Sequence, residues 1–462
     1  MLRVVMLASM VKEKLKSVAF LTLCILLVAC GPQTPPPAIQ QRPDQRFVEA
    51  ADDGQGPDEA ALTVAGPNRP VEKIKIAIML PLSGSESATG KALLRAAVTA
   101  LFDAYDPRLV LLPLDTEADI DQTRIMAERA IEEDVDIVLG PLLAGNFVAA
   151  ANILEPASIP IIGFTNDSSA AAAGRFIMGF MPETEVKRVV DYALTEGLLE
   201  YAALIPDGRY GARVRIAFGG AVTSGGATVA AIETYPPDPS ALIEPVKRLS
   251  NYDKRRKDMR DEIRFLRSLG DDLTDEIAAD LDKQEVLKGI TYDAVLLPEG
   301  GELLRTLGPL LPFYEIDPNK VKLLGTGLWS DPGLLREPPL QGAWFAAPSP
   351  SVPAEFLKRL EDNFREPVPR IATLAYDAVS LVAFLSRDDK PADGSSRYAA
   401  TILMNEKGFS GLDGLFRFLP DGTIERSLAV LEVHRRGFKV VDPAPSVFPS
   451  FGYALRQPAS PK

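Results

Sequence analysis

Short apolar runs alternate with amphipathic segments along most of this chain, and this alternation constrains its fold more than any other feature. The run IKIAIML at 74–80 is almost wholly apolar, as in strands that helices cover on both faces. Apolar residues at helical spacing follow it at 91–105, and the same succession then repeats. Strands alternating with helices of about 10 to 15 residues predict a doubly wound parallel sheet.

The succession occurs in two series. In the first, strands are expected at 74–80, 109–114, 135–139 and 159–164, with helices at 91–105, 123–133 and 144–154. In the second, strands are expected at 201–205, 228–234, 292–297 and 322–325, with a helix at 212–224. A last helix is expected at 371–385 and a hairpin at 427–441. Two series of this size predict two lobes joined by a connection that crosses more than once.

These boundaries predict one two-lobed α/β domain at 71–445. We expect the first lobe to hold about 71–182 and 346–390. The second lobe then holds about 183–345 and 391–441, and residues 446–462 form a tail.

The first 29 residues resemble a secretory signal. A basic leader precedes an apolar run at 18–27, which is shorter than the roughly 20 residues of a membrane-spanning helix. The run ends in LVAC at 27–30, which resembles the lipobox in which a cysteine is acylated before cleavage. We therefore expect residues 1–29 to be removed and Cys30 to carry lipid. The alternative is an ordinary signal peptide with a chance cysteine.

The residues after Cys30 read as a tether. Eight prolines fall within 31–70, among polar and small residues without apolar periodicity. Such a segment reaches about 35 Å as a coil and on the order of 120 Å when extended. Cys24 lies in the expected signal and Cys30 would be acylated, and the chain has two cysteines, so we expect no disulfide.

The charge argues against two classes of partner. The formal net charge is −13, and residues 1–29 hold four basic residues against one acid, so the remainder is more acidic still. Binding to nucleic acid, or to an anionic membrane surface by charge alone, is therefore not expected.

Four motifs together resemble the type I periplasmic binding proteins of the branched-chain-amino-acid-binding kind. They are LPLSG at 80–84, LGP at 139–141, DGRYG at 207–211 and AYDA at 375–378. Within that superfamily the chain is most similar to the penicillin-binding-protein activator lipoproteins. The GTGLW turn at 325–329 and a charged insertion that begins NYD at 251–253 carry this narrower resemblance.

The resemblance implies a non-enzymatic lipoprotein that regulates peptidoglycan synthesis by binding a penicillin-binding protein. The alternative is a substrate-binding lipoprotein of an ABC importer for amino acids or another small polar solute. Gly31, the residue after the expected lipid, is not the aspartate that retains lipoproteins at the inner membrane. We therefore expect the periplasmic side of the outer membrane, or the inner membrane or cell surface in a single-membraned cell.

Ligands of this fold bind at the carboxyl ends of the strands, between lobes that close about a hinge. The candidates at those positions are Ser83, Ser85, Thr89, Leu142, Leu143, Thr165, Asn166, Tyr210, Glu299 and Trp329. Amino-acid-binding relatives present hydroxyls where this chain has Leu142 and Leu143, so we expect a ligand other than a simple amino acid.

Several candidates have a structural alternative. Thr165 and Asn166 also suit capping or a turn. Trp329 would either stack on a ligand or cover the hinge. Glu299 would either pair with a ligand ammonium or lie in solvent.

Catalytic, metal and cofactor sites are not expected. His434 is the one histidine of the sequence, so a Ser-His-Asp or Cys-His site would have to use it. The sequence has no His/Cys cluster suited to zinc and no Gly-rich loop ending in Lys-Ser/Thr.

The insertion at 252–288 predicts a helical hairpin. Met259, Ile263 and Leu266 lie at helical spacing, Gly270 interrupts the pattern, and Leu273, Ile277, Leu281 and Val286 resume it. A narrow apolar stripe among dense alternating charges leaves two interpretations open. The stripe packs on the second lobe, or it is a docking surface for a protein partner.

Overall fold

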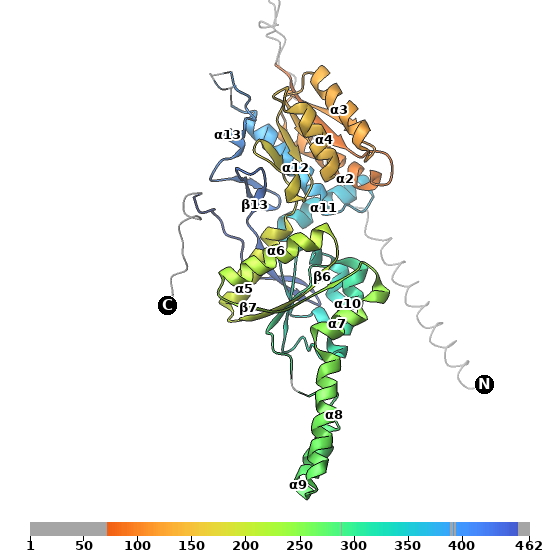
Figure 1. Ribbon diagram of the computed structural model, residues 1–462. Helices are drawn as coiled ribbons and strands as arrows, with labels where there is room; N and C mark the ends of the chain where they lie inside the picture. Colours follow the sequence, from red (N-terminus) through yellow and green to blue (C-terminus); the bar gives the residue numbers. More distant parts are fainter. Residues whose placement is uncertain (1–71, 288, 389–390, 392–393, 451–462) are drawn as a thin grey trace, which may run out of the picture. The chain divides into compact units, whose positions relative to one another are not determined.

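The computed structural model describes residues 72–450 except 288, 389–390 and 392–393 (Figure 1). The expected signal segment, Cys30, the tether and most of the expected tail lie outside the described residues.

The first sheet is entirely parallel, with strand order β2-β1-β3-β4-β5. Its strands are β1 (Ile74–Leu80), β2 (Leu109–Asp115), β3 (Ile137–Leu139), β4 (Ile161–Gly163) and β5 (Arg175–Ile177). Its helices are α2 (Ser87–Ala104), α3 (Ile120–Glu132), α4 (Ala144–Leu154) and α12 (Ala372–Leu385). Helix α2 packs against α12, and α3 packs against α4 (Figure 1). All of β1 except Lys75 is buried, which explains its continuous apolar sequence.

The second sheet has strand order β15-β14-β10-β9-β8-β6-β7. Its parallel strands are β6 (Glu200–Pro206), β7 (Thr228–Tyr235), β8 (Ala294–Leu296), β9 (Lys322–Gly325) and β10 (Trp344–Ala347). The expected hairpin forms its antiparallel edge as β14 (Ala429–His434) and β15 (Gly437–Asp442). The helices of this lobe are α5 (Pro182–Thr195), α6 (Arg209–Ser224), α7 (Ile243–Leu249) and α10 (Gly301–Phe313).

A small third sheet corrects the expected division of the lobes. It consists of β11 (Phe409–Gly411), β12 (Gly414–Phe418) and β13 (Ile424–Arg426). Its buried residues and those of the preceding segment, from Tyr398 onward, belong to the hydrophobic core of the first lobe, and the ring of Phe418 lies 5.1 Å from that of Phe176. The expectation that the chain returns to the second lobe at 391 is therefore wrong. The apolar side of this sheet packs on the core of the first lobe. The chain returns to the second lobe only after β13.

Three segments connect the lobes. They are 178–181 between β5 and α5, 348–350 between β10 and α11 (Ser351–Phe364), and 427–428 between β13 and β14. Hydrogen bonds tie the part of the chain around β13 to β5 and the first crossing segment, since Arg426 Nη2 of β13 donates to the main-chain oxygen of Met178 at 3.0 Å and Ile177 N of β5 donates to Gly422 O at 2.9 Å. Two parallel α/β lobes with several crossings confirm the predicted fold class.

The insertion folds as the predicted helical hairpin. Helix α8 (Tyr252–Leu269) ends at Gly270, whose φ of 69° suits glycine. Asp271 then caps α9 (Asp272–Leu281) by accepting a 3.0 Å hydrogen bond from Thr274 N. The pair has a small core of its own around Met259, Ile263 and Ala278, and Figure 1 shows α8 and α9 running side by side.

One glycine in each lobe brings the first strand and its following helix together. A Cβ on Gly90 of α2 would lie 2.0 Å from Pro81 O, and a Cβ on Gly211 of α6 would lie 1.7 Å from Pro206 O. Because any larger residue would push the helix away, these glycines fix the start of each helix beside the carboxyl end of its strand.

Candidate ligand site between the lobes

A hollow of about 260 Å³ lies beside the crossing segments and is lined from both lobes. Asn166 follows β4 of the first lobe, Tyr210 begins α6 of the second, and Leu328 and Ser330 follow β9. Carboxyl ends of parallel strands from both sheets therefore meet there, which is where ligands bind in open α/β sheets.

Buried hydroxyls at this hollow have no hydrogen-bond partner among the described residues. They are Tyr210 OH and Ser330 Oγ, which belong to lining residues, and Thr326 Oγ1 nearby. Burial raises the pKa of Tyr210, an effect that the adjacent Thr326 hydroxyl opposes, although the two groups do not meet the geometry of a hydrogen bond. Buried polar atoms are usually hydrogen-bonded, so these hydroxyls are the groups of this region with unused capacity to bond a polar partner.

Glu185 of α5 is the acidic group of the hollow. Its Oε2 accepts a 3.0 Å hydrogen bond from Gly327 N, and a Cβ at Gly327 would lie 2.4 Å from Oε1. Burial raises the pKa of Glu185 to about 7, against the lowering effect of the Gly327 N–H. This carboxyl therefore exchanges its proton near neutral pH, and acts as a donor on one side of that pH and an acceptor on the other.

A ring of ion pairs holds the two lobes together beside the hollow. Arg213 of α6 donates from Nη2 to Asn166 O at 2.6 Å and from Nε to Glu183 Oε1 at 2.7 Å. Arg209 Nη2 lies 3.1 Å from Asp167 Oδ2. We call Asn166, Asp167, Glu183, Arg209 and Arg213 the interlobe latch, since Asn166 and Asp167 follow a strand of the first lobe and the arginines belong to the second.

An aromatic side chain forms one wall of the hollow. Phe180 lies in the first crossing segment, and the guanidinium carbons of Arg370 and Arg426 lie 5.4 Å and 5.2 Å from the centre of its ring. Arg370 also pairs with the fully buried Asp413 at 2.7 Å. Cation–π contacts and an ion pair therefore hold Phe180 and Arg370 in place before any ligand arrives.

Sequence comparison finds a similarity to one protein family. The family described as periplasmic binding proteins matches residues 73–252. This part of the chain, less than half of its length, is similar to the periplasmic binding proteins.

Solved structures extend the likeness over both lobes. A putative branched-chain amino acid ABC transporter protein from Rhodospirillum rubrum is 20% identical, with a TM-score of 0.61 over 80% of this chain and 100% of that one. A solute-binding protein from Rhodopseudomonas palustris in complex with 3,4-dihydroxybenzoic acid is 18% identical, with a TM-score of 0.53 over 82% and 97% of the two chains. LivJ of Streptococcus pneumoniae, in complex with isoleucine, is 17% identical, with a TM-score of 0.52 over 80% and 100%. These likenesses show the type I periplasmic-binding-protein fold.

A curated relative carries no assigned function. An uncharacterized protein of Rickettsia prowazekii, RP748, is 25% identical over 228 residues, which are 47% of this chain and 60% of the relative. The match thus spans less than two thirds of the relative's length.

The periplasmic-binding-protein fold brings only some of the expected ligand residues to the hollow. Asn166 and Tyr210 line it. Ser83 and Ser85 are exposed and Thr89 is half-buried near the start of α2, and these three do not line it. Thr165 accepts a 3.1 Å hydrogen bond from Asp167 N, as the turn interpretation expects. Leu142 packs against the core of the first lobe, and Leu143 is exposed just before α4.

Two expected ligand contacts in the second lobe are corrected. Trp329 is fully buried in the core of its lobe, and its Nε1 donates a 3.0 Å hydrogen bond to Glu299 O. A side chain buried in this way does not offer its ring to a ligand. The Glu299 carboxylate is half-buried and not free, because it accepts hydrogen bonds from Tyr235 OH and Gly300 N, both at 2.9 Å.

The sequence analysis missed Glu185, Leu328 and Arg370. Leu328, beside the predicted Trp329, lines the hollow while the tryptophan turns into the core. Glu185 lies at a helix position that nothing in the local sequence distinguishes. The one available signal was the pair of glycines in GTG at 325–327, which indicates that another part of the chain lies close to the backbone there.

Among the described residues, no group of three or more His, Cys, Asp or Glu side chains is arranged to hold a metal ion. Within the same residues, no helix is long and apolar enough to cross a membrane.

Proposed function

We propose that this chain is a non-enzymatic envelope lipoprotein that binds a small polar ligand, other than a simple amino acid, between its two lobes. The observation that carries the proposal is the set of unpaired buried hydroxyls at the interlobe hollow. Two structural neighbours, in complex with isoleucine and with 3,4-dihydroxybenzoic acid, support a small ligand.

A ligand screen by thermal shift tests the proposal. A ligand found in the screen should raise the Tm of the wild type and lose at least tenfold in affinity with Tyr210→Phe or Ser330→Ala. Ser83→Ala, which changes an exposed hydroxyl outside the hollow, is the matched control and should bind as the wild type does. Equal binding by all three variants would refute this location. Calorimetric titration with leucine should show no tight binding.

Anchoring through Cys30 has its own test. Metabolic labelling with a fatty acid should mark the wild-type chain, and Cys30→Ala should lose both the label and its association with membranes. Firm membrane association of the Cys30→Ala chain would show that acylation is not the anchor.

A second function, regulation of peptidoglycan synthesis by contact with a penicillin-binding protein, is favoured by the α8–α9 hairpin. The hairpin has a core of its own, while Phe265, Leu269 and Leu273 on it are more than half exposed. Its own core does not require these apolar side chains, which makes them available to a partner.

Replacing 254–285 by a short Gly-Ser linker tests this role. The variant should keep the Tm of the rest of the chain and lose stimulation of a purified peptidoglycan synthase. Loss of solute uptake in cells without this protein, with synthase activity unchanged, would favour the alternative role in an ABC importer.

A further inference from the structure

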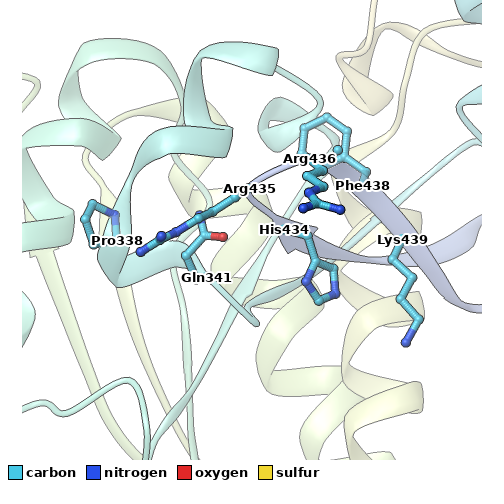
Figure 2. A pocket seen from close by; sticks show the side chains of 8 residues that line it. Pro338, Gln341, His434, Arg435, Arg436, Phe438 and Lys439 are labelled. Atoms are coloured by element: carbon cyan, nitrogen blue, oxygen red, sulfur yellow. The ribbon is translucent and has the colours of Figure 1, made fainter.

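The turn between β14 and β15 forms a second hollow, of about 770 Å³, that belongs to the second lobe alone. Figure 2 shows Arg435 extending beside Gln341 toward Pro338, with Arg436, His434 and Lys439 on the other side of the turn. This basic hollow is separate from the interlobe hollow, since the two share no lining residue.

The pairing of the two strands explains why basic side chains gather here. Val433 lies opposite Phe438 and His434 lies opposite Gly437, so Arg435 and Arg436 occupy the tip of the hairpin. The ring of Phe438 packs on that of Phe345 at 5.2 Å. The hairpin is thereby anchored to the core of the lobe, and the basic side chains extend from a rigid base.

The arginines and the lysine of this hollow form no close ion pair among the described residues, although Lys439 lies opposite Glu432 in the strand pairing. Among the described residues, no ion pair of 4 Å or less is found for Arg435, Arg436 or Lys439, and all three are exposed. His434 Nε2 lies 2.7 Å from Glu432 Oε1. Glu432 also accepts a 2.9 Å hydrogen bond from Trp344 Nε1, so both of its oxygens already have partners.

The rest of the chain makes this cluster unusual. The protein carries a formal net charge of −13, and arginines such as Arg188, Arg213 and Arg417 lie against carboxylates. Three unpaired cations around one concave site repel each other, and an anion in the site would relieve that repulsion.

We propose that the basic hollow binds a phosphate-bearing group. Two guanidinium groups offer planar pairs of N–H donors that match phosphate oxygens, and a nearby ammonium adds a compact positive charge. Pro338 and Phe438 give the hollow an apolar edge. The phosphate-bearing group belongs either to a lipid headgroup or to a soluble molecule.

Two binding measurements on the full chain separate these sources. Calorimetry with inorganic phosphate at constant ionic strength tests the soluble form. Co-sedimentation with phosphatidylcholine vesicles, with and without phosphatidylglycerol, tests the headgroup, because any lipid anchor contributes equally to both compositions.

The variant for both measurements carries Arg435→Ala and Arg436→Ala. Its control carries Arg256→Ala and Arg260→Ala, which remove the same charge from exposed positions on α8. We expect at least a tenfold loss of phosphate affinity, or loss of the phosphatidylglycerol preference, in the first variant and less than a twofold change in the control.

The outcomes are distinct. A preference for vesicles with phosphatidylglycerol, without binding of inorganic phosphate, identifies a lipid headgroup. Binding of inorganic phosphate without that preference identifies a soluble ligand. Absence of both responses in the wild type, or equal losses in the two variants, overturns the proposal.

Discussion

Arg213 Nη2 of the second lobe donates a 2.6 Å hydrogen bond to the main-chain oxygen of Asn166 in the first. The Arg213 side chain is 16% exposed and also pairs with Glu183, so its removal leaves the Asn166 carbonyl without this donor and the Glu183 carboxylate with the 2.8 Å hydrogen bond from Ser168 Oγ. The latch thus couples the loop after β4 to the start of α6, and both of these segments line the interlobe hollow.

Arg213→Ala should lower the free energy of unfolding by about 1–3 kcal/mol, as expected for charge-assisted hydrogen bonds at a partly buried site. The radius of gyration from small-angle scattering should also rise as the lobes separate. Arg215→Ala removes an exposed arginine of the same helix and should stay within about 0.5 kcal/mol of the wild type. Equal effects of the two substitutions would show that the latch does not hold the lobes.

The raised pKa of Glu185 predicts how stability depends on pH. Its pKa is about 7 in the folded protein against an ordinary value of 4.5 for a glutamate, so between these values the folded state binds more protons. The contribution of Glu185 to the free energy of unfolding is complete below pH 4.5 and is lost as the pH rises through 7. The difference amounts to up to about 3 kcal/mol.

Glu185→Gln should therefore flatten the decline of unfolding free energy between pH 4.5 and 8, measured by urea denaturation. Part of the decline should remain, because burial raises the pKa of Asp377 to about 7 as well. Glu128→Gln, at an exposed position of α3, should leave the slope unchanged. A Glu185→Gln slope equal to that of the wild type would contradict the assignment.

Two glycines of helix α6 should respond to alanine in opposite directions. Gly211→Ala places a methyl group 1.7 Å from Pro206 O, a main-chain atom that cannot turn aside, so we expect a loss of more than about 3 kcal/mol or failure to fold. At Gly219 a Cβ meets nothing within 4 Å. Gly219→Ala should stabilise the protein by about 0.5–1 kcal/mol, because glycine disfavours helices. Thermal unfolding followed by circular dichroism distinguishes the two directions.

The α8–α9 hairpin should unfold without the rest of the domain. Ile263 is 6% exposed in the small core of the hairpin, so Ile263→Asp buries a charge there and should melt both helices. We expect lower helical circular dichroism and rapid hydrogen exchange at 252–281, with little change in the main Tm. Leu273→Asp, at a position that is 65% exposed, should leave the helicity intact. A lowered main Tm for Ile263→Asp would show that the hairpin and the lobe unfold together.

Much of the fold was predictable because its signals are local. The helix at 144–154 and the strand at 322–325 form with the predicted bounds, since each is an apolar segment ended by turn residues. The hairpin at 252–288 was predictable for the same reason. The segment from Tyr398 to Ile424 was misplaced because short apolar strands suit either lobe, and the choice depends on partners such as Phe176 that lie far away in the sequence.

The sequence by itself determined the parallel sheets of the two lobes, the charged helical hairpin and the hairpin at 427–441, because periodicity, glycine positions and charge are properties of neighbouring residues. Only the tertiary structure decided which side chains meet. Trp329 lies in the core of its lobe, whereas the neighbouring Leu328 lines the interlobe hollow. The tertiary structure also buried Glu185 against Gly327 and raised the pKa of that carboxyl, because burial and electrostatic environment depend on the packing of segments more than 140 residues apart.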